Sequence, residues 1–143
     1  MSSRSNGVVA YTAPSAGGPD SIGYQVTDQY GDSVKGTFIT QVDTGPTAGT
    51  LSTTSKLGAA TDLTSAILGV DKAGLAEDVL SLSGIGTTGT LGAVSFANGR
   101  ITYSATGSAL TAAVTLGSAT DSFAYTVRDQ LGDVAVGLVS IRV

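Results

Sequence analysis

Paired aspartates are the residues of this chain whose type and spacing could do chemistry. Asp28 and Asp32 stand four positions apart, and Asp129 and Asp133 repeat that spacing. Two such carboxylates could hold a cation, or each could accept hydrogen bonds from its own backbone in a tight turn, as Asp commonly does. We favour the turn as the role of both pairs.

Composition excludes most catalytic arrangements. The 143 residues include no His and no Cys, so His-based acid–base pairs, thiol nucleophiles and zinc sites are not expected. The glycine-rich stretch 84–89 resembles a phosphate-binding loop, but no predicted helix follows it and it contains no Lys. A glycosidase would need two acids that converge on a cleft, whereas these acids lie in predicted turns and linkers. We therefore expect no enzymatic activity.

Charge and hydropathy narrow the class of partner. The net charge is −4, and only 7 residues are Lys or Arg, which argues against nucleic acid and anionic membranes as partners. Mean hydropathy is +0.27, which is higher than expected for a disordered chain. No apolar run approaches the roughly 18 residues needed to span a bilayer. Residues 1–6 lack the apolar region of a signal peptide, so none is expected in this form.

An internal repeat organises the elements that would position these residues. Residues 20–32 and 121–133 are identical at 8 of 13 positions. The match extends upstream, where 6–11 parallels 98–103, and downstream, where 34–42 parallels 135–143. The second copy carries nine extra residues within about 106–118. A repeating unit of about 100 residues follows.

Hydrophobic periodicity predicts the strands of one unit. Apolar residues alternate with polar ones in 101–103, 123–127 and 139–143, and the last two runs flank a turn at 129–133. Residues 78–83 and 91–96 add two more strands, which a predicted turn at 84–89 separates. The single short helix candidate covers 62–68, with Asp62 as its N-cap.

Six or seven short strands separated by turns predict an all-β fold, an antiparallel Ig-like β-sandwich. We predict a partial module of three strands over 1–43, a linker over 44–50 that contains Pro46, and a complete module over 51–143. Tyrosines at matching positions of the two copies are predicted to pack in the core, and these are Tyr11, Tyr24, Tyr103 and Tyr125. Tyr30 is the exception, because it lies in a predicted hairpin loop.

The repeat resembles a known family. The pattern Asn-Gly-x-Ile-Thr-Tyr, then Asp-Ser-Phe-x-Tyr-x-Val-x-Asp-x-x-Gly-Asp and a final alternating strand, is similar to cadherin-like and bacterial Ig-like repeats. These include the VCBS-type and tandem repeats of large secreted bacterial adhesins and biofilm surface proteins. The resemblance implies an extracellular, non-enzymatic module at the bacterial cell surface, with neighbouring repeats or copies of itself as partners.

The resemblance also implies a calcium site. Such repeats often bind Ca²⁺ at junctions through acidic residues, and the matching positions here are Asp43, Asp71, Asp78 and Asp129. Asp71 and Asp78 depart from the usual pattern because seven positions, and not two, separate them. Calcium takes six to eight oxygen ligands, so these residues are few. The cofactor expectation is therefore none, or Ca²⁺.

The last strand of the second copy predicts an interface. Its outward positions are Val134, Val136 and Leu138, where the first copy has Ser33, Lys35 and Thr37. A strand that is apolar on both faces is normally covered on both. Either the nine-residue insertion or a loop folds over these three side chains, or they contact a neighbouring subunit or repeat. Tyr30 is a further candidate contact residue.

Three functions remain open at this point. The first is a structural or adhesive repeat module of a large bacterial surface protein. The second is a self-assembling subunit of a filament or surface layer, in which strand exchange between neighbours completes the partial module. The third is a module that binds a glycan or a host surface, which would need exposed aromatic residues such as Tyr30.

Overall fold

The computed structural model describes residues 2–5 and 8–143 of the chain, which form two compact units, 1–44 and 45–143. The first unit holds strands β1 (Ser2–Ser5), β2 (Val8–Tyr11), β3 (Gly18–Thr27) and β4 (Ser33–Val42). β1 pairs with β2 and β3 pairs with β4, both antiparallel. Asn6 and Gly7, which the repeat aligns with Asn98 and Gly99, lie outside the described residues.

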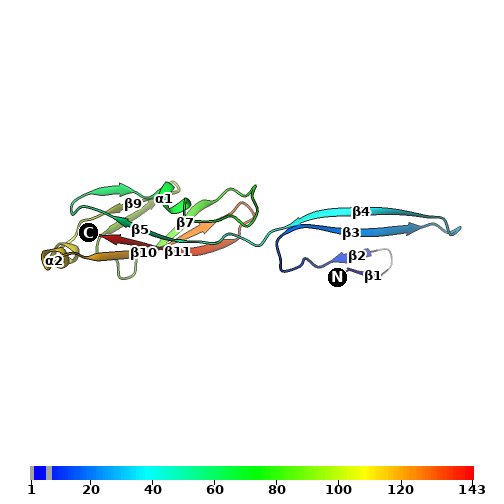
Figure 1. Cartoon of the computed structure of the whole chain (residues 1–143), viewed down its shortest axis with the longest axis horizontal. Helices are drawn as coiled ribbons and strands as arrows, with labels where there is room; N and C mark the ends of the chain where they lie inside the picture. The colour runs from blue at the N-terminus through cyan, green and yellow to red at the C-terminus, as the bar shows by residue number, and fades with distance from the viewer. Residues whose placement is uncertain (1, 6–7) are drawn as a thin grey trace. The chain divides into compact units, whose positions relative to one another are not determined.

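The second unit is a β-sandwich of two sheets (Figure 1). Its strands are β5 (Thr50–Thr54), β6 (Ala60–Asp62), β7 (Ser81–Gly86), β8 (Ala93–Ala97), β9 (Arg100–Ser104), β10 (Thr120–Arg128) and β11 (Val134–Arg142). One sheet has the order β5-β11-β10-β7 and the other β6-β9-β8. The pairs are antiparallel except β5, which runs parallel to β11. The predicted all-β sandwich is confirmed.

The core of the second unit lies between its two sheets, where alternate side chains of each strand point inward. Burial in β10 follows this period of two, with Asp121, Phe123, Tyr125 and Val127 buried and their neighbours more exposed. Phe123 stacks on Tyr103 of the opposite sheet at a ring separation of 6.4 Å. Each fully buried side chain of this size contributes about 1.5–3 kcal/mol.

Two helices complete the second unit. α1 (Thr64–Leu68) begins two residues later than the predicted Asp62 cap, and its N-cap residue is Leu63. The Asp62 carboxylate nevertheless accepts a hydrogen bond of 2.9 Å from the Thr64 amide. α2 (Ser108–Thr115) was not predicted, although it occupies most of the nine-residue insertion. It buries Leu110 in the core, with Ala113 and Val114 packed against the same core.

The strands before α2 differ in extent from the prediction. β7 includes Gly84, Ile85 and Gly86, which we expected in a turn, and β8 begins two residues later than predicted. Residues expected in the linker join the second unit: Thr47 pairs with Lys72, and the Gly49 amide donates to Asp71 over 2.9 Å.

The two copies of the repeat have the same backbone register. Ile22 faces Phe38 and Tyr24 faces Gly36 in β3–β4. The same pairings recur 101 positions later, where Phe123 faces Val139 and Tyr125 faces Gly137. β1 is a fourth strand beyond the three predicted, because its pairing with β2 corresponds to that of β8 with β9. The first unit therefore corresponds to β8–β11 without α2.

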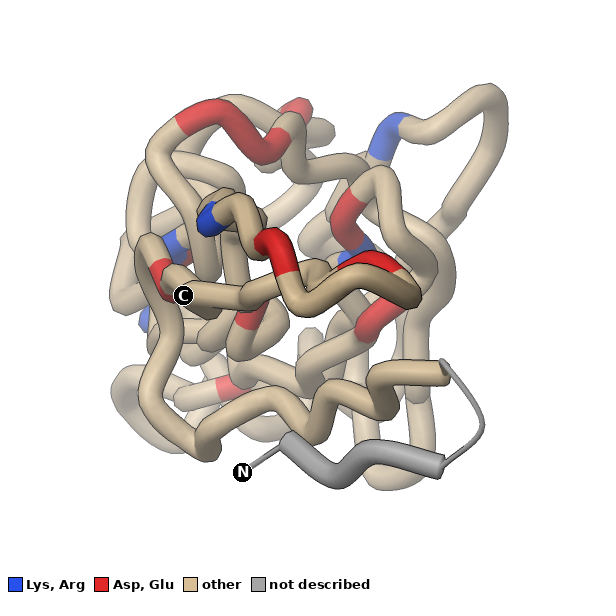
Figure 2. Tube along the Cα trace, turned by 90° about the vertical axis from the view of Figure 1, so that its right-hand side faces the viewer, with Lys and Arg blue, Asp and Glu red and all other residues tan. Residues whose placement is uncertain are grey.

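The sequence contains 11 acidic and 7 basic residues. Red segments outnumber blue ones along the coloured part of the trace in Figure 2. Among the described residues, no helix is long and apolar enough to cross a membrane.

Candidate functional site

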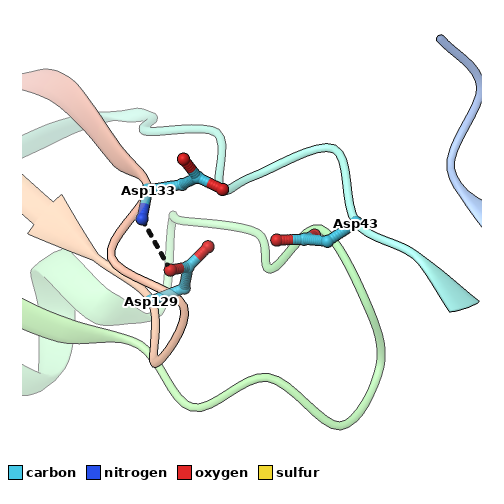
Figure 3. A group of neighbouring side chains, drawn as sticks. All are labelled: Asp43, Asp129 and Asp133. Carbon is cyan, nitrogen blue, oxygen red and sulfur yellow. Dashed lines mark hydrogen bonds between the residues drawn. The ribbon is translucent and has the colours of Figure 1, made fainter. Parts of the chain in front are cut away.

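The paired aspartates form the two hairpin turns, as predicted. The Asp28 carboxylate accepts hydrogen bonds from the amides of Tyr30 and Asp32, at 2.9 and 3.0 Å. Asp129 accepts from the amides of Gly132 and Asp133, at 2.8 and 2.9 Å. Figure 3 shows the second of these bonds. In both copies one Asp oxygen therefore satisfies the backbone donors that close the turn.

The second carboxylate oxygen of Asp129 is a candidate cation ligand in the second unit. The Asp129 side chain is 4% exposed, and its Oδ2 atom is buried without a hydrogen-bond partner among the described residues. A carboxylate oxygen of Asp133 lies within 4.8 Å of a carboxylate oxygen of Asp129. An unpaired buried carboxylate oxygen is costly, so a cation would stabilise this turn. Asp43, also drawn in Figure 3, belongs to the first unit.

The other two predicted calcium ligands have different partners. Asp71 accepts hydrogen bonds from the Tyr125 hydroxyl and the Gly49 amide, at 2.5 and 2.9 Å. Asp78 accepts from the Leu75 amide over 2.8 Å. Within the described part of the chain, neither belongs to a group of three carboxylates close enough to share an ion. Asp71 therefore anchors a core tyrosine, and Asp78 closes a local loop.

A tyrosine–aspartate pair recurs in both copies, buried in the second and partly buried in the first, and the sequence pattern did not predict it. The Tyr103 hydroxyl donates to Asp121 over 2.8 Å, and the Tyr11 hydroxyl donates to Asp20 over 2.7 Å. Asp121 also accepts from the amides of Leu91 and Gly92. Burial raises the pKa of Asp121, but these hydrogen bonds outweigh it and hold the pKa below the ordinary value. The sequence signal that could have predicted this pair is that the aspartate and the tyrosine are identical in both copies.

The first unit has an open apolar groove of about 380 Å³. Its lining residues are Val9, Tyr11, Ile22, Tyr24, Phe38 and Thr40. Their counterparts in the second unit are Ile101, Tyr103, Phe123, Tyr125, Val139 and Ile141. All six counterparts are core residues with at most 2% exposure, whereas Tyr24 is 43% and Phe38 54% exposed. The groove is thus the inner face of a sandwich in which no described residue of the first unit corresponds to β5, β6, α1 or β7.

Tyr24 illustrates what the open groove lacks. Its counterpart Tyr125 is fully buried and donates to Asp71 and to the Gly49 carbonyl. Tyr24 makes no hydrogen bond to any residue that the structure describes. Core packing is therefore confirmed for Tyr103 and Tyr125, while the prediction is wrong for Tyr24, because no strand among the described residues of the first unit covers it.

The predicted interface residues are exposed. Val134, Val136 and Leu138 are 59%, 68% and 44% exposed. The insertion does not cover them, because α2 directs Leu110 into the core. Tyr30 is 82% exposed at the tip of the first hairpin. Contact with a neighbour is the remaining hypothesis for all four residues.

Comparisons with protein family models, with curated proteins and with solved structures found no match to this chain.

Proposed function

We propose that this chain is a non-enzymatic structural or adhesive repeat module of a large extracellular bacterial surface protein. One observation carries the proposal: the same hairpin, with the same cross-strand register and the same Tyr–Asp bond, occurs twice in one chain. A repeated unit of fixed geometry suits a spacer or an adhesive array, because length and valency grow with each copy. The resemblance to adhesin repeats supports the same conclusion.

Antibody labelling of the source cells tests this proposal. Antibodies raised against the purified chain are expected to label intact cells, and brief protease treatment of those cells should remove the signal. A cytoplasmic protein labelled in parallel controls for cell integrity. Labelling that requires lysis of the cells would contradict the extracellular assignment.

Self-assembly is a second candidate, and the exposed side chains of Val134, Val136 and Leu138 favour it. Three adjacent outward apolar residues on one strand form a surface that a neighbour could cover. Light scattering across a concentration series should detect association, and replacing the three residues by Ser should abolish it. A monomer at all concentrations would argue against this candidate.

Calcium binding is a further proposal, and the buried, unpartnered Oδ2 atom of Asp129 supports it. Asp129 and Asp133 could supply two of the six to eight oxygens that calcium takes. The contribution of Asp43 stays a prediction. Thermal melting in calcium and in EGTA is the test: the melting temperature should fall in EGTA, and Asp129→Asn should remove the difference while Asp78→Asn keeps it. Equal melting temperatures in the original chain would remove calcium from the proposal.

A further inference from the structure

The second unit shows what covers the counterpart of the open groove. Residues 45–92 supply β5, β6, α1 and β7. From this segment, Leu63, Ile67 and Leu82 enter the core, with exposures of 4%, 0% and 5%. They pack in one cluster with the six residues that correspond to the groove lining. We refer to residues 45–92 as the donor segment.

The donor segment also pairs with three strand edges. β5 runs parallel to β11 along 138–142, β7 runs antiparallel to β10 along 124–128, and β6 pairs with β9 at 102–104. The corresponding residues of the first unit are 37–41, 23–27 and 10–12. Among the described residues, these edges have no strand beside them. Open edges next to an apolar groove are the surface on which an added strand binds.

We propose that the first unit is an acceptor for a polypeptide segment with the pattern of the donor segment, supplied from outside these 143 residues. A β5-like strand binds parallel to β4 along Thr37–Gln41. Apolar side chains equivalent to those of Leu63, Ile67 and Leu82 fill the groove. An acid equivalent to Asp71 accepts the hydrogen bond of the Tyr24 hydroxyl. The inference rests on the proposed function, because the donor is itself a repeat segment.

Stoichiometry excludes a second copy of this chain as the donor. The described part of these 143 residues contains one donor segment and two acceptor halves, β1–β4 and β8–β11. Exchange between copies therefore leaves one acceptor per chain empty, however many chains assemble. The donor segment is already buried in the core of its own unit, so its release would cost as much as its capture gains. Only an additional donor segment fills the groove.

The experiment adds a separate peptide of residues 45–92 to the full-length chain and follows amide hydrogen exchange. Exchange along 37–41 and 23–27 should slow by at least about tenfold as those amides become paired, while exchange along β10 and β11 stays unchanged. A control peptide with Ile67→Asp and Leu82→Asp should have no effect. Unchanged exchange along β4, or an equal effect of the control peptide, would overturn the proposal.

A fusion keeps the proposal testable if the free peptide does not stay in solution. A second copy of residues 45–92 placed directly before residue 1 continues the repeat in register, since residue 1 corresponds to Ala93. This fusion should unfold with a second cooperative transition that the chain itself lacks, and the Ile67→Asp and Leu82→Asp changes in the added copy should remove it. Absence of the second transition would overturn the proposal.

Light scattering and hydrogen exchange of the chain without added donor test the alternative that the first units of two chains cover each other. The proposal expects the groove to stay open, with fast exchange along β4 at every concentration. A dimer that protects β4 on its own would show that two first units cover each other, and it would overturn the proposal. Labelling of intact cells is independent of all these outcomes, so failure of the donor experiment leaves the proposed function standing.

Discussion

The hydroxyl of Tyr103 donates a hydrogen bond of 2.8 Å to the Asp121 carboxylate, and both side chains are 1% exposed. The bond joins β9 of one sheet to β10 of the other. Asp121 also accepts hydrogen bonds from the amides of Leu91 and Gly92. These bonds fix the segment that precedes β8. One buried carboxylate thus connects both layers of the sandwich, and its loss would leave several buried donors unpaired.

Asp121→Asn should destabilise the second unit by about 3 kcal/mol, because the new amide cannot accept from all of these donors. Urea denaturation followed by far-ultraviolet circular dichroism measures the change in the free energy of unfolding. Asp20→Asn, the matched change in the first unit, should have a smaller effect because Asp20 is only partly buried. Equal effects of the two variants would show that burial of the pair is not what matters.

The stability of the second unit should depend on pH in the acid range. The folded-state pKa of Asp121 lies below its ordinary value, so folding favours the ionised form. Hydrogen bonds from Thr64 and Arg100 likewise lower the pKa of Asp62 to about 2. For a depressed pKa, the stabilisation is complete above the unfolded-state value near 3.9 and is lost as the pH falls through the folded-state value.

Urea midpoints measured between pH 6 and about pH 2 should therefore be constant at first and then fall below about pH 4. Asp121→Asn should reduce the slope of that fall, since the variant has no proton to gain at this position. A midpoint that rises on acidification would contradict the assignment of both carboxylates as ionised in the folded state.

The side chain of Tyr125 lies over Gly137 and leaves no room for a Cβ atom at this position. A Cβ atom at Gly137 would meet the tyrosine ring and would stand 2.6 Å from the Gly49 carbonyl oxygen. Gly137→Ala should therefore destabilise the second unit by about 3 kcal/mol, measured by urea denaturation. Gly84→Ala is the control, because its Cβ would meet nothing nearer than 3.8 Å.

Gly36→Ala, the matched substitution in the first unit, tests whether the two copies respond differently to the same change. Tyr24 lies over Gly36 as Tyr125 lies over Gly137, but the Tyr24 side chain is exposed and free of described hydrogen-bond partners, so it can rotate away. The cost should be well below that of Gly137→Ala. A cost as large as that of Gly137→Ala would indicate that the groove over Tyr24 is already filled in solution.

The repeat and its strands could be predicted because they depend on local pattern. Residues 123–127 alternate in a way that only a half-buried strand explains, and identity between the copies located Asp28 and Asp129 in equivalent turns. α2 was not predicted because the helix is short, and its apolar residues Leu110, Ala113 and Val114 lie among small residues that give no clear helical periodicity. The role of Asp71 could not be predicted, since its partner Tyr125 is 54 positions away and no local pattern reports such a contact.

The two faces of β11 give a last prediction, from two adjacent residues. Leu138 is 44% exposed on the outer face, whereas Val139 is 0% exposed in the core. Leu138→Ser should change the free energy of unfolding by less than about 0.5 kcal/mol, while Val139→Ser should cost about 3 kcal/mol, because it removes apolar contacts and buries a hydroxyl. Urea denaturation of the dilute chain measures both. If Leu138→Ser costs as much as Val139→Ser under dilute conditions, the outer face is covered within the chain itself, and Leu138 is not available to a neighbour.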